Sequence, residues 1–200
     1  MKHLLTPCCL ALMVLAGCAI RAPQPDIAWS AEQSAAMTRF MVHGKVGFRR
    51  GESGGSAALV WKQDGAGYDL VATGPLGQGA TQIHGNATWV RIASGKEVRE
   101  SDVPETLLGE ALGWPVAIDS LAWWVRGLPA PGHDAEIDSD AEGKPARIRQ
   151  QGWDILLDRW RASGNRLLPH RLVATGGDSR ITLLIERWDS PRHGSRKKAE

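Results

Sequence analysis

Cysteine is scarce in this chain of 200 residues, which contains only Cys8, Cys9 and Cys18. The first two fall in a segment that we expect to be removed, and we expect Cys18 to be modified. The mature chain would then have no disulfide bond and no thiolate for catalysis or metal binding. We therefore expect packing alone to stabilise the fold.

A hydrophobic run long enough to cross a membrane is also missing. A spanning helix needs about 20 apolar residues, whereas the stretch Leu4–Leu15 has about a dozen residues and is interrupted by polar or helix-breaking ones. Lys2 precedes this stretch, and Leu15-Ala16-Gly17-Cys18 completes it in the pattern of a bacterial lipobox. These features predict a signal peptide over residues 1–17 and a lipid on Cys18. The alternative is an ordinary secretory signal in which the cysteine occurs by chance.

The residue after the lipobox cysteine predicts the location of the protein. Ala19 stands there, where Asp would be typical of retention in the inner membrane of Gram-negative bacteria. We therefore expect the protein at the periplasmic face of the outer membrane, anchored through Cys18.

The remaining chain is long enough for one domain with a substantial core. Residues 18–28 contain Pro23 and Pro25, which oppose helix formation, and are expected to form a tether. A single domain is expected over residues 29–190. The basic tail over residues 191–200 is expected to be disordered and solvated.

No set of residues typical of an enzyme stands out. Gly51-Glu52-Ser53-Gly54-Gly55 matches the G-x-S-x-G pattern of a serine nucleophile, but it lies between two predicted strands and so predicts a flexible hairpin loop. Asp138 and Asp140 fall in a polar segment, residues 134–144, which we expect to be a solvated loop. No phosphate-binding or dinucleotide-binding loop is present, and the histidines after residue 18 lack metal-binding spacing: His43, His84, His133, His170 and His193. We expect no catalysis, cofactor, metal or nucleic-acid binding.

The hydrophobic pattern predicts a mainly β fold with short helices, of the α+β class. Apolar residues alternate with polar ones in short segments separated by turns, as in an antiparallel meander. The Ser30-Ala31-Glu32-Gln33 sequence predicts a capping box for a first helix. We expect strands at 40–48, 56–62, 68–73, 80–84, 89–92 and 96–100, a turn at 85–86, helices at 31–39, 104–112 and 116–125, and strands at 146–150, 153–160, 168–174 and 180–189. The simplest arrangement is a strongly curved, unclosed antiparallel barrel around the two central helices.

One loop has an unexpected composition. The segment Gly74-Pro75-Leu76-Gly77-Gln78-Gly79 joins two predicted strands and places Leu76 at its apex. Turn geometry does not require leucine, since Gly, Pro, Asn, Asp and Ser are the usual turn residues. From the sequence alone, Leu76 either folds back onto the sheet or forms an exposed apolar finger that can enter a membrane.

The chain resembles the LolB family of outer-membrane lipoproteins over nearly its whole mature length. The resemblance rests on the lipobox and on four further features in order: Gly74-Pro75-Leu76-Gly77 after Tyr68, Trp124-Val125-Arg126-Gly127-Leu128-Pro129, Gln151-Gly152-Trp153, and a last strand that ends at Trp188. The resemblance implies an unclosed β-barrel with a helical lid around an apolar cavity for acyl chains. It also implies that Pro75, Leu76 and Gly77 form a membrane-delivery loop with Leu76 exposed.

The aromatic composition is compatible with such a cavity. Nine tryptophans accompany one tyrosine and two phenylalanines, and tryptophan offers a large apolar surface that fills a core or lines a pocket. The candidates for the cavity wall are Trp61, Trp89, Trp123, Trp124 and Trp153, for each of which ordinary core packing is an equal alternative.

The function implied by the resemblance is that of a receptor without enzyme activity. It would accept lipoproteins from a periplasmic carrier similar to LolA and insert them into outer-membrane lipid, acting as a monomer. Three alternatives stay open: a related cavity protein that binds another lipid or envelope component, a purely structural lipoprotein, and an envelope hydrolase that uses Ser53.

Overall fold

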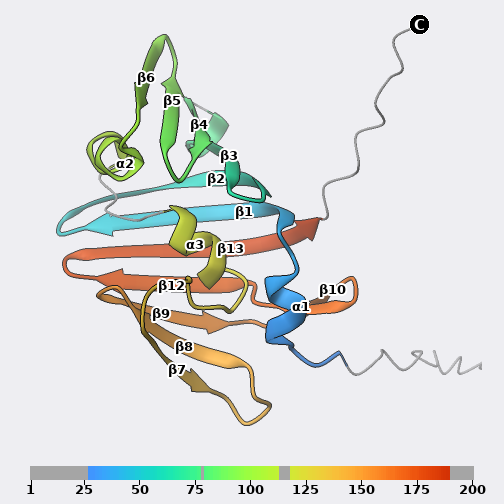
Figure 1. Cartoon of the computed structure of the whole chain (residues 1–200). Helices are drawn as coiled ribbons and strands as arrows, with labels where there is room; N and C mark the ends of the chain where they lie inside the picture. The colour runs from blue at the N-terminus through green and yellow to red at the C-terminus, as the bar shows by residue number, and fades with distance from the viewer. Residues whose placement is uncertain (1–26, 78, 113–117, 190–200) are drawn as a thin grey trace, which may run out of the picture.

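The computed structural model describes residues 27–77, 79–112 and 118–189, which form a large antiparallel sheet with short helices (Figure 1). The predicted lipidation site, Cys18, and the predicted tether and tail lie outside these residues or at their margin. Within the described part of the chain, no helix combines the length and the apolar character needed to span a membrane.

The main sheet has 11 strands in the order β6-β5-β4-β3-β2-β1-β13-β12-β9-β8-β7. Because β6 and β7 are its two edges and do not pair with each other, the sheet is not closed, and the predicted open antiparallel architecture is confirmed. The strands are β1 (Arg39–Arg50), β2 (Ser53–Asp64), β3 (Gly67–Thr73), β4 (Ala80–Asn86), β5 (Trp89–Ser94), β6 (Glu97–Ser101), β7 (Ala135–Ser139), β8 (Pro145–Gln150), β9 (Trp153–Asp158), β12 (Arg171–Gly176) and β13 (Ser179–Asp189). A separate ribbon contains β10 (Arg161–Ser163) and β11 (Arg166–Leu168).

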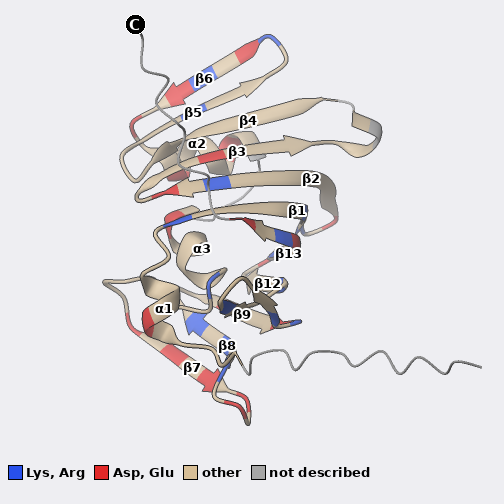
Figure 2. Ribbon diagram, turned by 90° about the vertical axis from the view of Figure 1, so that its right-hand side faces the viewer, with Lys and Arg blue, Asp and Glu red and all other residues tan. Residues whose placement is uncertain are grey.

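The period-two alternation of the sequence corresponds to the two faces of this sheet. In β2, for example, Leu59 and Trp61 are buried, whereas Ala58, Val60 and Lys62 between and beside them are exposed. The buried face packs against the helices, and Figure 2 shows the sheet curving around them. The buried members of the core that the structure describes lie between Phe40 and Ile185, so a form of the chain that begins after Cys18 retains all of them.

The two central helices supply the other side of the core. Helix α2 (Pro104–Leu112) contributes Leu107 and Leu108, and α3 (Ile118–Trp124) contributes Ile118, Leu121 and Ala122. Both central helices were predicted, although residues 113–117 lie outside the described residues. Gly127 has a φ of 82°, a conformation that suits glycine at the end of a helix.

The first helix is shorter than predicted. Ser30 caps α1 (Ala31–Ala35) as expected, and its hydroxyl accepts a hydrogen bond of 3.3 Å from the backbone N–H of Gln33. The prediction that the helix continues to Arg39 is wrong, because Arg39 already pairs with Asp64 as the first residue of β1. The pairing of β1 with β2 therefore overrides the local helical pattern.

The polar segment at residues 134–144 is not the continuous loop that we predicted. Residues 135–139 form the edge strand β7, which pairs with β8. Arg149 of β8 forms ion pairs across the strands with Glu136 (3.3 Å) and Asp138 (3.0 Å). The strand lacks the usual apolar alternation because an edge strand is commonly charged, which protects it from pairing with other chains.

The predicted positions of one turn and two strands differ from those in the structure by a few residues. The predicted turn at 85–86 lies at residues 87–88, since β4 continues to Asn86. The strand predicted at 153–160 ends at Asp158, and the strand predicted at 168–174 is divided between β11 and β12. These shifts leave the order of the elements unchanged.

Candidate functional site

An apolar cavity of about 270 Å³ lies against the inner face of strands β1 to β4. Thr81 is the one polar side chain among its lining residues in the described part of the chain. Helix α2 contributes Ala111 to the wall, and the two glycines that begin and end the β3–β4 loop contribute the rim. The lining residues are Val46, Phe48, Ala57, Leu59, Leu70, Ala72, Gly74, Gly79, Thr81, Ile83 and Ala111. A cavity of this composition suits an aliphatic ligand.

The β3–β4 loop forms a tight turn at the rim of this cavity. Its base is held by a hydrogen bond of 3.1 Å from the N–H of Gly74 to the carbonyl of Gly79. Residues Pro75–Gly77 form the short 3-10 helix η1, in which Gly77 donates to the carbonyl of Gly74 over 3.2 Å. Pro75 and Gly77 are exposed, and the backbone of Leu76 lies between them. The sequence-predicted loop thus adjoins the apolar cavity, and the role of Leu76 stays a prediction.

The tryptophans predicted for the cavity wall lie elsewhere in the described structure. Trp61 and Trp124 are fully buried in the core, where their indole N–H groups donate to Gln63 (2.9 Å) and Gln150 (2.8 Å). The other three are half-buried. Trp89 packs edge-on against His84, and Trp123 lines a second cavity of about 340 Å³ near α1. Trp153 lines an open groove at the end of the sheet where β7 starts, β8 ends and β9 starts. Contact of any of the five with lipid remains a prediction. The sequence did not predict the aliphatic lining. Alternation of apolar and polar residues indicates which face of a strand is buried, but it does not show whether that face lines a cavity or packs in the core.

Arg126 is a second feature for which the sequence predicted no role, although the residue belongs to one of the motifs shared with the LolB-like pattern. It belongs to the segment that follows α3 and is only 5% exposed. Its guanidinium donates to the carbonyls of Ala122 (2.8 Å), Ser34 (3.1 Å) and Met37 (3.0 Å), and it lies 4.4 Å from the ring centre of Trp123. Burial lowers the pKa of Arg126 to about 10, so the group is still charged at neutral pH. Arg126 therefore fastens the end of α1 to α3, beside the second cavity.

Replacement of Arg126 by methionine is expected to reduce the free energy of unfolding by about 3 kcal/mol, because buried carbonyls at the end of α1 would lose charged donors. Urea denaturation followed by tryptophan fluorescence measures this change. Arg166→Met is the matched control, since Arg166 also donates to α1, at the carbonyl of Gln33 (3.3 Å), but in an exposed position. Its expected effect is below about 1 kcal/mol, and equal losses in the two variants would contradict the role given to Arg126.

In the described part of the chain, no hydrogen bond joins Ser53 to any of the histidines considered for catalysis. Ser53 is the exposed first residue of β2, so the hairpin predicted around it is confirmed, although its turn is shorter than expected. His43 pairs with Asp189 at 3.3 Å, and His84 pairs with Asp69 on the sheet surface. In residues 27–189, apart from those not described, no group of three or more His, Cys, Asp or Glu side chains is placed to hold a metal ion.

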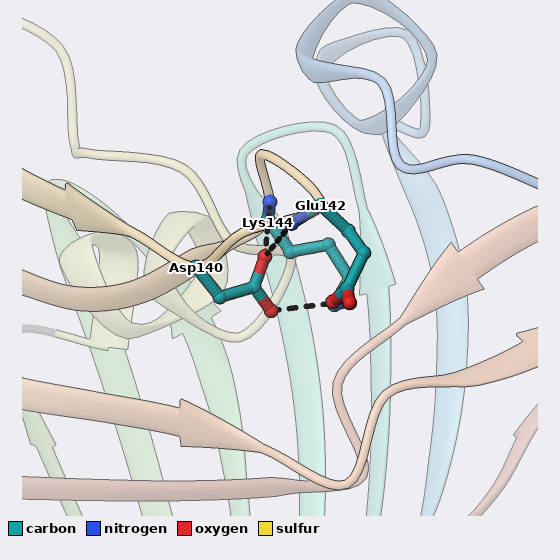
Figure 3. Close-up of polar contacts among 3 residues, drawn as sticks. All are labelled: Asp140, Glu142 and Lys144. Carbon is teal, nitrogen blue, oxygen red and sulfur yellow. Dashed lines mark hydrogen bonds and ion pairs between the residues drawn. The ribbon is translucent and has the colours of Figure 1, made fainter.

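Asp140 has a structural role at the turn between β7 and β8. Figure 3 shows its carboxylate facing Lys144, at 3.0 Å from the ammonium nitrogen, with Glu142 beside them. Desolvation would raise the pKa of Asp140, but the hydrogen bonds from Lys144 outweigh it and lower the pKa. These contacts hold the turn between β7 and β8 together, and they give the charged residues Asp140, Glu142 and Lys144 a structural role.

The open sheet, the helices on its inner face and the aliphatic cavity define the class: half-barrel proteins with an internal apolar cavity. A solved structure of a LolA-superfamily protein from Nitrosomonas europaea has the same fold, with a TM-score of 0.54 at 9% identity over 79% of this chain and 90% of that chain.

Sequence comparison identifies the family within this class. The model of the family described as outer membrane lipoprotein LolB matches residues 38–188. The outer-membrane lipoprotein LolB of Stutzerimonas stutzeri is 36% identical over 97% of this chain and 98% of its own length, and that of Chromohalobacter salexigens is 37% identical over 88% and 85%. The chain belongs to the LolB family, which confirms the resemblance found in its sequence.

Proposed function

We propose that the protein is an outer-membrane receptor that accepts lipoproteins from a periplasmic carrier and inserts them into the outer membrane. The observation that carries this proposal is the aliphatic cavity whose rim is formed by the loop that contains Leu76. Membership of the LolB family, whose relatives are named outer-membrane lipoproteins, supports it. In this role the protein binds and transfers its cargo without a chemical step.

The energetics of lipid anchors require a receptor of this kind. Burial of an acyl chain is worth about 0.8 kcal/mol per methylene group, so exposing several chains to water costs tens of kcal/mol. A carrier and a receiver must each shield the chains, and transfer proceeds if the receiver binds them more tightly. The aliphatic wall from β1 to β4 supplies such shielding.

The cavity must widen to take up a complete anchor. Its volume of about 270 Å³ lies just below the range for ligand sites, which runs from about 300 to 1,000 Å³. Ala111 of α2 is the helical contribution to its wall, whereas the rest of the wall is sheet and loop. We infer that displacement of α2 from the sheet opens the cavity, because a helix moves with less loss of hydrogen bonds than a strand in the middle of a sheet.

The remaining parts of the proposal concern the membrane. A lipid on Cys18 holds the protein at the periplasmic face of the outer membrane, and Leu76 enters the bilayer during delivery. The anchor assists delivery but is not required for it, since Leu76 reaches lipid on its own. The protein acts as a monomer.

The test is a transfer experiment with a form that begins at Ala19 and therefore lacks Cys18. It is mixed with a periplasmic carrier of the LolA type loaded with a triacylated lipoprotein, and cargo on each protein is measured after separation. We expect most of the cargo to move to the receptor, and then to vesicles of outer-membrane lipid when these are added.

Two outcomes would contradict the proposal. Cargo that stays on the carrier would exclude a receptor function. Efficient uptake of a different lipid in place of lipoprotein would favour the alternative cavity protein, which mass spectrometry of the bound material identifies. A third outcome would leave the receptor function in place: if the form without Cys18 accepts cargo but does not deliver it, only the proposal that the anchor is dispensable would be wrong.

A further inference from the structure

The second cavity, of about 340 Å³, lies at the end of the sheet opposite to the β3–β4 loop. It is bounded by α1, the start of β1, one face of α3 and the turns that join β2 to β3 and β4 to β5. Its wall is mostly apolar but contains charges of both signs. Six of its lining residues matter here: Phe40, Ala66, Ala87, Asp119, Trp123 and Arg126.

Arg126 places a positive charge in this wall without a carboxylate to balance it. The residue is only 5% exposed, and within the described part of the chain no Asp or Glu lies within ion-pair distance of its guanidinium. Its described partners are neutral, namely backbone carbonyls and the ring of Trp123 at 4.4 Å. Buried charges are normally paired, because removing an ion from water is costly. An anion in the cavity would supply the missing charge.

The guanidinium also has hydrogen-bond donors left for an anion. Its Nε donates to the carbonyl of Ala122, and its Nη1 donates to the carbonyls of Ser34, Ala35 and Met37. Nη2 donates to no described residue, yet it is not one of the enclosed polar atoms that lack a partner, so it is accessible. Because Arg126 lines the cavity, an acceptor reaches Nη2 from there. One side of the guanidinium thus holds α1 and α3 together, and the other side is left for a ligand.

Asp119 is the negative charge of the same wall, and its distance decides whether an anion is tolerated. Asp119, Ala122, Trp123 and Arg126 are spaced so that they follow one face of α3 and the turn after it. Seven residues of helix span about 10 Å, and only burial and Glu105 raise the pKa of Asp119. An anion on Nη2 is therefore much closer to the positive charge than to the negative one. Since Coulomb energy falls with distance, the attraction exceeds the repulsion.

We propose that the second cavity binds the head of an anionic amphiphile, with its phosphate or carboxylate on Nη2 of Arg126. A guanidinium suits these two anions because its N–H groups match the spacing of their oxygens. The first methylene groups of the chain pack on the apolar surface of Phe40, Ala66 and Ala87. The volume of about 340 Å³ falls within the range of about 300 to 1,000 Å³ for small-molecule sites.

This site differs from the aliphatic cavity in both position and chemistry. On the inner face of β2, Leu59 lines the aliphatic cavity and Gln63 lines the second cavity, and the fully buried Trp61 lies between them. The anchor of a triacylated lipoprotein holds its chains through ester and amide groups, which carry no charge, whereas a buried guanidinium favours an anion. The second cavity therefore takes a ligand other than the cargo of the proposed function, and the inference does not depend on that function.

The test is an NMR titration of the ¹⁵N-labelled form that begins at Ala19, with octyl phosphate, octanoate and octanol below the concentrations at which they form micelles. We expect the two anions to shift the amides of Ala66, Ala87 and Trp123 in a saturable way, and octanol to bind at least about tenfold more weakly. Octyl phosphate represents a phospholipid headgroup and octanoate a free fatty acid, so their relative affinity identifies the source of the anion. Either order supports the proposal.

Four variants locate the site. Asp119→Asn should tighten the binding of both anions about threefold to tenfold and leave that of octanol unchanged, because the opposing charge of the wall is lost. Glu97→Gln, a similar charge loss at the exposed start of β6, is the matched control and should have no effect. Ala57→Phe, which fills the aliphatic cavity, should leave the binding of the anions unchanged. Arg126→Met should weaken it at least about tenfold, and circular dichroism separates this loss from a loss of fold.

Three results would overturn the proposal: no saturable shifts with either anion, octanol bound as tightly as the anions, or unchanged affinity for the anions in Asp119→Asn. Loss of anion binding in Ala57→Phe would also overturn it, because the anions would then occupy the aliphatic cavity. These results do not require Arg126→Met to fold. No probe is a lipoprotein, so the outcome is independent of the transfer experiment.

Discussion

Leu76→Glu is expected to leave the acceptance of lipoproteins intact and to reduce their delivery to vesicles to less than about one tenth. The backbone of Leu76 lies in η1, in the loop whose two ends contribute to the rim of the cavity, whereas the described wall of the cavity comes mainly from β1 to β4 and α2. We therefore expect a change at Leu76 to spare the site that holds the acyl chains. A carboxylate in place of leucine would have to enter the hydrocarbon region, which costs about 2.5–3.5 kcal/mol on insertion scales, whereas leucine gains about 0.3–0.6 kcal/mol. The measurement is cargo on the receptor and in the vesicles after transfer from a loaded carrier.

A substitution of the same kind on the far edge of the sheet serves as the control. Ile137 in β7 is 46% exposed, so Ile137→Glu places a new carboxylate on an apolar surface site remote from the loop. We expect normal acceptance and normal delivery from this variant. Delivery by Leu76→Glu at the level of Ile137→Glu would remove Leu76 from the mechanism.

The main sheet was predictable because burial follows the alternation of the sequence so closely. In β1, Phe40, Val42 and Val46 are buried at every second or fourth position, and this face meets the apolar residues of α3. The same alternation places the β3–β4 loop correctly between two strands, so the sequence identifies the loop beside the cavity. The strands and the loop were therefore predictable from two local properties of the sequence: the period of the apolar side chains and the positions of the turn residues.

Features that depend on contacts between distant segments were not predictable. The strand β7 exists because Arg149 and the backbone of β8 pair with it, and its own residues resemble a loop. Arg126 acts on α1, more than 80 residues earlier in the chain. No local pattern encodes either contact.

The tryptophans show why the residues of the cavity wall could not be predicted from the sequence. A large aromatic side chain suits a core and a cavity wall equally, and the sequence contains no signal that separates the two roles. The deciding factor is how neighbouring elements fill the space, as where Gln63 and Gln150 satisfy the indole groups of Trp61 and Trp124 inside the core. The cavity at the loop is instead left open where small residues, Ala57 and Ala72, face the interior.

Those small residues make the cavity testable by filling it. Ala57 is half-buried, points inward from β2 and lines the cavity. We expect Ala57→Phe to reduce the acceptance of lipoprotein at least about tenfold, because a phenyl ring takes the volume that one acyl chain would use. The free energy of unfolding should stay the same or rise, since filling a cavity commonly adds about 0.5–2 kcal/mol. Transfer from a loaded carrier and urea denaturation measure the two effects.

The adjacent residue provides the control, because successive side chains of a strand point to opposite faces. Ala58 is exposed on the outer face of the same strand, and Ala58→Phe should accept and deliver cargo normally. Normal acceptance by Ala57→Phe would show that the acyl chains bind elsewhere, and the second cavity beside Trp123 would then be the next site to fill. Loss of acceptance in Ala57→Phe alone, with delivery lost separately in Leu76→Glu, would divide the function into two steps: a cavity that holds the lipid, and a loop at its rim that releases the lipid to the membrane.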